Sequence, residues 1–186
     1  SDAGLTQARP QGTGIPSDEV QPPPSEMAPP NDQPAADAAA RFGFDHSTSN
    51  WKSIIENPDI DLIDNATPNN SHAEIAIAAL AAGKHVICEK PLARTVEEAA
   101  AMYEAARKSN SVNMVAFNYR RTPAVALAKK YIEDGSIGRI INFRATYLQD
   151  WSADPNSPLS WRFQKSVAGS GAVGDILTHV LDLARY

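Results

Sequence analysis

The chain has 186 residues and a formal net charge of -5, with 42% hydrophobic and 21% charged residues. This is the usage of an ordinary globular protein, so a sizeable core can be buried in one domain or in two partial ones. The acidic balance and the lack of a basic stripe argue against a nucleic-acid partner, and the longest apolar stretches, such as Ile75 to Ala82, are too short to cross a membrane.

Cys88 is the only cysteine, so no internal disulfide is possible. Because the fold then does not depend on an oxidising compartment, we expect a cytoplasmic protein. The N-terminus has neither the charged start and apolar run of a secretory signal nor an initiator Met, and we expect it to be a cut end.

Residues 1–34 are expected to form a disordered, proline-rich segment. They hold eight of the 14 prolines and no aromatic residue, and they contain one basic residue against five acidic ones. Such a composition offers too little apolar surface to offset the entropy of ordering the chain. The acidity of the protein is therefore concentrated in this segment.

From residue 35 onward, helical and strand-like segments alternate, which is typical of a parallel sheet with crossover helices. We expect helices at 35–42, 50–57, 71–82, 95–108 and 123–134 and after Gly174, and strands at 60–66, 85–88, 112–117 and 140–148. The apolar run 60–66 is typical of a buried parallel strand. Ser71 and Thr95 each stand three residues before a Glu, which predicts two capping boxes. Residues 35–122 are expected to form one α/β domain, and residues 123–186 to begin a second.

Polar motifs stand where three of the expected strands end. Thr67-Pro68-Asn69 follows the first strand, Glu89-Lys90-Pro91 the second and Asn118-Tyr119-Arg120 the third. In open α/β sheets ligands bind beyond the carboxyl ends of the strands, so the motifs predict a ligand site there. A proline confines the residue before it to extended geometry, which gives Lys90 a defined direction. From the tripeptide alone, a solvated loop lysine is the alternative.

Asp175 and His179 are four residues apart on the expected last helix, so they can share one face and reach one substrate or each other. A capping Asp and a satisfied buried His are the structural alternative, which the spacing alone favours. A metal site is a further alternative, but zinc sites usually need at least three protein ligands, and no third ligand or metal-type motif accompanies the pair.

The order of these motifs resembles the Gfo/Idh/MocA family of oxidoreductases, which includes glucose-fructose oxidoreductase and inositol dehydrogenase. The family's cofactor half is similar to residues 63–69, His72 and residues 83–93 of this chain. Its hinge and the opening of its substrate half are similar to residues 118–121, 135–138, 161–162 and 169–179. The resemblance covers about Ala36 to Tyr186.

The resemblance implies an α/β protein in which an incomplete Rossmann-like parallel sheet is followed by the start of an α/β substrate domain. It implies oxidation of a hydroxyl of a sugar or cyclitol with NAD or NADP, and homo-oligomers in full-length members. The implied catalytic residues are Lys90, Asp175 and His179. The residues implied to border the cofactor are Thr67, Pro68, Asn69, His72, Glu89, Lys90, Asn118 and Arg162, of which Arg162 could instead approach the substrate.

The three implied catalytic residues fit alcohol oxidation. A hydride passes to the nicotinamide while neutral His179 takes the hydroxyl proton near pH 7. Asp175 would orient the His or bind a neighbouring hydroxyl, and Lys90 would stabilise negative charge that develops on the oxygen.

The chain departs from the family pattern at both ends. The family begins with a strand and a Gly-rich turn that holds the pyrophosphate, whereas Gly12-Thr13-Gly14 lacks the third glycine and follows no apolar strand. The position that distinguishes NAD from NADP is also absent, and the expected substrate domain stops at Tyr186. We therefore expect this chain alone not to turn over an alcohol. A non-catalytic remnant, or a binding or scaffold module, is the alternative.

Overall fold

The computed structural model describes residues 32–186, and the proline-rich segment 1–31 lies outside the described residues. For residues 1–31 the predicted disorder stays a prediction. Gln33 and Pro34, which were included in that prediction, belong to the first turn of helix α1 (Gln33–Phe42). The helix ends at Gly43, whose φ of 75° is the left-handed conformation of a glycine cap.

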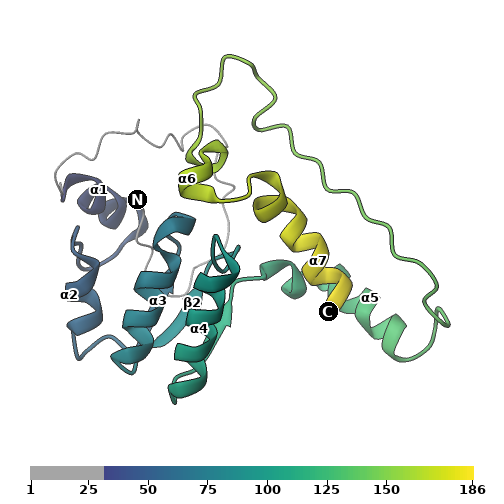
Figure 1. Ribbon diagram of the computed structural model, residues 1–186, viewed down its shortest axis with the longest axis horizontal. Coiled ribbons are helices and arrows are strands. Elements are labelled where there is room, and N and C mark those ends of the chain that lie inside the picture. Colours follow the sequence, from purple (N-terminus) through teal and green to yellow (C-terminus); the bar gives the residue numbers. More distant parts are fainter. Residues whose placement is uncertain (1–31) are drawn as a thin grey trace.

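Three short strands form a parallel sheet in the order β1-β2-β3. Strand β1 (Leu62–Asn65) pairs with β2 (His85–Cys88), which pairs with β3 (Asn113–Val115). Helix α3 (His72–Ala81) connects the first two strands, and α4 (Val96–Lys108) connects the second two. Figure 1 shows α3 and α4 side by side on one face of the sheet. Right-handed crossovers in a sheet whose strand order follows chain order place both helices on that face.

The hydrophobic core lies between the sheet and these two helices. It includes Ile63, Val86 and Cys88 from the strands and Ile75, Ala76, Ala79, Leu80 and Met102 from the helices. The expected buried strand at 60–66 is observed as the parallel strand β1, which is buried at Ile63 and Asn65, whereas Leu62, on the other face, is 41% exposed. Burial, with the charges of Glu89 and Asp64, raises the pKa of Cys88 to about 12, so this thiol stays protonated at neutral pH.

One of the two predicted capping boxes forms its first bond. The Thr95 hydroxyl accepts a hydrogen bond from the Glu98 amide at 3.2 Å, so the predicted N-cap of α4 is confirmed. The capping box at Ser71 is wrong, because a 3-10 turn, η1 (Asn69–Ser71), precedes α3 and gives Ser71 a helical backbone. An N-cap needs an extended backbone, and the Ser71 hydroxyl instead donates to the Pro68 carbonyl at 2.8 Å.

Short helices make up the rest of the described chain, and every helix in it is too short or too polar to span a bilayer. The remaining elements are α2 (Trp51–Glu56), η2 (Asn118–Arg121), α5 (Pro123–Glu133), η3 (Trp161–Phe163), α6 (Lys165–Ala168), the π-helical turn η4 (Val173–Leu177) and α7 (Thr178–Arg185).

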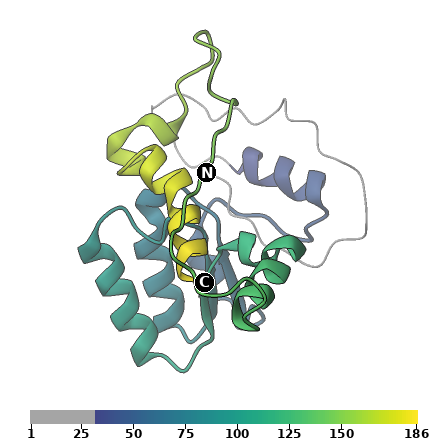
Figure 2. The same ribbon diagram turned by 90° about the vertical axis from the view of Figure 1, so that its right-hand side faces the viewer.

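The predicted strand at 140–148 is wrong. Residues 139–150 have no regular secondary structure, and the connection from α5 to η3 arcs away from the sheet (Figures 1 and 2). A strand is stabilised by hydrogen bonds to a neighbouring strand, and no part of the chain from 32 to 186 pairs with this segment. Its apolar side chains stay in solvent, with Ile141 and Leu148 each 85% exposed.

Helix α6 is attached to the loops that follow β1 and β2. The Asn69 amide donates to the Ala168 carbonyl at 2.9 Å, and the Arg94 guanidinium donates to the Ser166 carbonyl at 2.9 Å. Gly169 follows the helix with a φ of 86°, and a Cβ there would lie 3.1 Å from the Arg94 Cβ. The close approach and the backbone conformation both favour glycine at this position.

We expect Gly169→Ala to destabilise the protein more than Gly171→Ala. Both positions have a positive φ, which costs an alanine about 1 kcal/mol. Only at Gly169 does the new methyl meet Arg94, which adds about 1–3 kcal/mol, because a Cβ at Gly171 would have no neighbour within 4 Å. Urea denaturation followed by circular dichroism measures both free energies of unfolding, and equal losses would contradict the importance of the close approach.

Candidate active site

The loops that follow the three strands lie at one edge of the sheet. Because β1, β2 and β3 are parallel, the motifs at 67–69, 89–91 and 118–120 all follow carboxyl ends at this edge. Such an edge is where open α/β sheets bind ligands. Helices α6 and α7 lie beside it (Figure 1).

Lys90 and Asp175 form an ion pair between the end of β2 and η4. The Lys90 ammonium donates to Asp175 Oδ1 at 2.8 Å and to the Asp175 carbonyl at 2.9 Å. The two side chains are only 18% and 24% exposed, so water screens the pair weakly. The Arg162 guanidinium lies 3.8 Å from the other Asp175 oxygen. Asp175 therefore lies between two cations.

His179 lies in the first turn of α7 and is 6% exposed. Burial, and then the Lys90 charge, lower its pKa, while Asp175 and Asp182 oppose the shift and do not cancel it. Its Nδ1 atom is buried and has no hydrogen-bond partner among the described residues. The structure thus brings His179 within the electrostatic influence of Lys90 and Asp175, and it leaves one ring nitrogen available.

The backbone before His179 is a π-helical turn instead of the regular helix expected there. Such turns are rare and are frequent at functional sites. The turn follows Gly171 and places Asp175 one turn before His179. The described hydrogen bonds and ion pairs of the Asp175 side chain join it to Lys90 and Arg162. None of them joins Asp175 to His179, so no direct contact supports the prediction that Asp175 orients His179.

A stack of aromatic rings covers His179. The Tyr119 ring lies parallel to the imidazole, with 4.2 Å between centroids and 19° between planes. The Tyr119 hydroxyl hydrogen-bonds to the Tyr147 hydroxyl, and this bond, with burial, raises the pKa of Tyr119 to about 12. Tyr119 therefore stays neutral at neutral pH, and its ring covers one face of the His179 imidazole.

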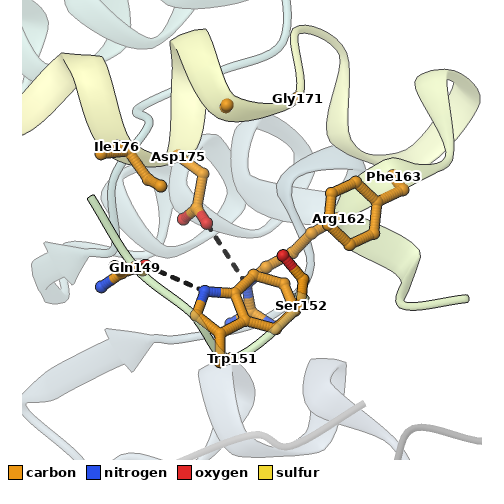
Figure 3. Close-up of a pocket in the computed structure, with 9 residues that line it drawn as sticks. Gln149, Trp151, Ser152, Arg162, Phe163, Gly171, Asp175 and Ile176 are labelled. Atoms are coloured by element: carbon orange, nitrogen blue, oxygen red, sulfur yellow. Dashed lines mark hydrogen bonds and ion pairs between the residues drawn. The ribbon is translucent and has the colours of Figure 1, made fainter. Parts of the chain in front are cut away.

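A small cavity of about 70 Å³ opens beside Asp175. Figure 3 shows Gln149, Trp151, Ser152, Arg162 and Phe163 around it. Trp151 donates from its indole nitrogen to Gln149 at 2.9 Å, and Gln149 donates to Tyr147 at 2.6 Å. The cavity thus combines aromatic rings, neutral hydrogen-bonding groups and one cation next to the Lys90–Asp175 pair.

Two family models cover most of the chain. Residues 25–117 match the NAD-binding Rossmann fold of the Gfo/Idh/MocA oxidoreductases, and residues 125–186 match the C-terminal domain of the same family. The chain belongs to the Gfo/Idh/MocA oxidoreductase family.

Several relatives in this family act on sugars or related compounds by name. Levoglucosan dehydrogenase of Pseudarthrobacter phenanthrenivorans is 74% identical over 84% of this chain, and 1,5-anhydro-D-fructose reductase of Ensifer adhaerens is 36% identical over 80%. The chain spans 40% and 44% of the length of these two relatives. A solved structure of levoglucosan dehydrogenase with NADH and levoglucosan is 74% identical, with a TM-score of 0.81 over 84% of this chain and 42% of that one.

The other residues implied by the family resemblance differ in what they can contact. Thr67, Pro68, Glu89 and Asn118 lie on the loops at the carboxyl edge, and Asn118 is exposed. The Asn69 amide is used in the bond to α6. His72 is fully buried, and its two ring nitrogens face the carbonyls of Thr67 and Pro91 at 2.8 and 3.0 Å. A contribution of His72 to cofactor binding would therefore act through the loops that it holds together.

Sequence reasoning did not single out four side chains that lie at the candidate site. They are Tyr119, Tyr147, Trp151 and Asp182. Tyr119 belongs to the motif at 118–120, and Asp182 follows His179 by three residues, so the local sequence indicated that both could lie near the site. Tyr147 and Trp151 lie in irregular chain, where no periodic pattern predicts which side chains meet.

We expect Lys90→Met to raise the pKa of His179. The Lys90 charge disfavours a second positive charge on the ring, and its removal also frees Asp175 to attract a proton. In the unsubstituted protein the lowered pKa keeps His179 neutral at neutral pH, and protonation begins only at a lower pH. An NMR titration of the imidazole Cε1 proton measures both values. Lys108→Met, on the exposed side of α4, is the control, and an unchanged or lower pKa in Lys90→Met would contradict the electrostatic coupling.

Proposed function

We propose that the chain is part of an NAD-dependent enzyme that oxidises a hydroxyl group of a sugar, with an anhydrosugar such as levoglucosan as substrate. The single observation behind this proposal is the Lys90–Asp175 ion pair beside a buried His179 with a free ring nitrogen. The 74% identity to levoglucosan dehydrogenase supports the choice of substrate, and the family's NAD-binding fold supports the cofactor.

The described residues fit a dinucleotide at the carboxyl edge of the sheet. NAD, when bound, supplies the acceptor for the hydride. Thr67, Glu89 and Asn118 lie on the three loops that would border it, and His179 Nδ1 is a buried polar atom that lacks a partner in residues 32–186. The chemistry of the chain itself is limited to the proton and to the charge on the substrate oxygen.

Each residue of the site has a separate role in the proposed reaction. Neutral His179 accepts the proton of the substrate hydroxyl, and its lowered pKa keeps it neutral for this task. The Lys90 ammonium stabilises the negative charge that develops on the oxygen as the proton leaves. Asp175 holds the Lys90 side chain in place by accepting two hydrogen bonds from it, one at the carboxylate and one at the backbone carbonyl.

The cavity beside Asp175 suits a sugar. Trp151 and Phe163 can pack against the C–H face of a saturated ring, and Gln149, Ser152 and Arg162 can hydrogen-bond to its hydroxyl groups. The mixture of aromatic and neutral polar groups, with a single cation, favours a neutral polyol over a strongly anionic substrate.

No observation favours the expected inactivity or the remnant alternative. The predicted self-association likewise stays a prediction, and the exposed apolar side chains at Ile141 and Leu148 are a surface on which it would act.

The proposal predicts that NADH binds more tightly than NADPH and that levoglucosan is oxidised with NAD. Nicotinamide fluorescence measures binding, and the appearance of NADH measures turnover with levoglucosan, myo-inositol and a panel of hexoses. We expect His179→Asn to lower kcat by about 10²–10⁴-fold with NADH binding retained, because only the proton acceptor is removed.

His46→Asn is the matched control, because His46 is exposed and remote from the catalytic motifs in sequence. Turnover would also overturn the expectation of an inactive chain. If the full-length protein that contains this chain bound no NADH and oxidised none of the sugars, the proposed function would be rejected in favour of the remnant or scaffold alternative.

A further inference from the structure

Helix α7 depends on tertiary contacts for its position. It has eight residues, and an isolated helix of this length is marginal in water. Its contacts with the sheet side of the molecule therefore decide where His179 lies. One of these contacts is an ion pair between Asp182 and Arg120, which comes from η2 directly after β3.

The geometry of the Arg120–Asp182 contact fixes the relative orientation of the two side chains as well as the distance between them. Arg120 Nε donates to Asp182 Oδ2 at 2.8 Å, and a terminal guanidinium nitrogen donates to Oδ1. Two parallel bonds from a planar guanidinium restrict rotation, which a single bond from a lysine cannot do. The Asp182 side chain is only 6% exposed, so loss of this partner would leave a buried carboxylate without its cation.

The pair also lies next to His179. Asp175, His179 and Asp182 follow one another at steps of four and three residues, so their side chains share one side of η4 and α7. Lys90, at the end of β2, binds Asp175 before His179, and Arg120, after the neighbouring strand β3, binds Asp182 beyond it. His179 thus lies between two ion pairs whose cations come from adjacent strands.

Further contacts join Arg120 to the surroundings of His179. The guanidinium carbon lies 5.8 Å from the centre of the Phe117 ring and 5.1 Å from that of Tyr186. The Phe117 ring makes an edge contact with the His179 ring, with 6.3 Å between centroids, and Tyr119, the residue before Arg120, stacks on the imidazole. A displacement of Arg120 would therefore move the aromatic contacts of the imidazole together with the helix.

We propose that Arg120 is a positioning residue that, through Asp182, fixes the position of His179 relative to Lys90 at the carboxyl edge of the sheet. This inference rests on the proposed function for its effect on turnover, whereas its structural part concerns His179 alone. Arg120 acts through Asp182 and has no part in the proton transfer.

Arg120→Lys is the test, because it keeps the charge and removes the two parallel bonds. We expect the Cε1 proton signal of His179 to shift as the ring leaves the face of Tyr119, and kcat to fall about 100-fold with KM nearly unchanged, as for a misplaced catalytic group. Arg107→Lys is the matched control, since Arg107 pairs with Glu104 on the exposed surface of α4. It should leave both measurements unchanged.

The reciprocal variant Arg120→Asp with Asp182→Arg covers the case in which Arg120→Lys does not fold. Partial restoration of the His179 signal, relative to either single charge reversal, supports the proposal. An unshifted His179 signal in folded Arg120→Lys, or no restoration in the reciprocal variant, overturns it. The NMR signal needs no turnover, so it decides the role of Arg120 even if the protein oxidises no sugar. The absence of turnover would reject the proposed function alone.

Discussion

The ion pair between Lys90 and Asp175 is the interaction on which the site depends. It joins residues 85 positions apart, and it attaches the turn before His179 to the end of a strand in the sheet. Two bonds to the same residue, one to the carboxylate and one to the carbonyl, restrain both the side chain and the backbone of the π-helical turn. Without this pair, the partly buried Lys90 ammonium would lose its carboxylate, which is unfavourable, and Asp175 would keep the Arg162 guanidinium, at 3.8 Å, as its cation.

The parallel sheet makes that ion pair possible. Because the three strands run in one direction, the chain leaves each of them at the same edge, and Lys90 and Arg120 emerge from adjacent strands there. Both crossover helices cover one face, so the core is closed on that side while the edge stays accessible to α6 and α7. A short sheet of this kind positions charged side chains more rigidly than loops alone can.

Local rules predicted the elements that depend on local interactions. Strand β2 was predicted with its observed bounds, because Gly83 ends the preceding helix and the buried residues Val86 and Cys88 alternate within the strand. The Thr95 cap was also predicted, since its partner amide is three residues away. At Ser71 the same spacing predicted a capping box that does not form, because the chain enters α3 through a 3-10 turn. At 140–148 an alternating pattern indicated a strand, but pairing is not a local property.

The site was predictable to the extent that its residues stand at strand ends or share a helix. Lys90, Asp175 and His179 met these conditions, and the family resemblance assigned their roles. Arg120 and Asp182 are 62 residues apart, and no spacing rule predicts that they meet. The same holds for Tyr119, whose partner Tyr147 lies in irregular chain. What sequence analysis could not supply was the set of contacts between the two halves of the chain.

Those contacts explain the sign of the electrostatic effect on His179. Asp175 and Asp182 raise the pKa of His179, and each of them is paired with a cation, Lys90 or Arg120. With the carboxylates compensated, burial beneath Tyr119 and the nearby Lys90 charge prevail, and the pKa falls. The imidazole is consequently neutral at neutral pH. The two ion pairs that hold the helix in place thus also weaken the effect by which its carboxylates favour the protonated imidazole.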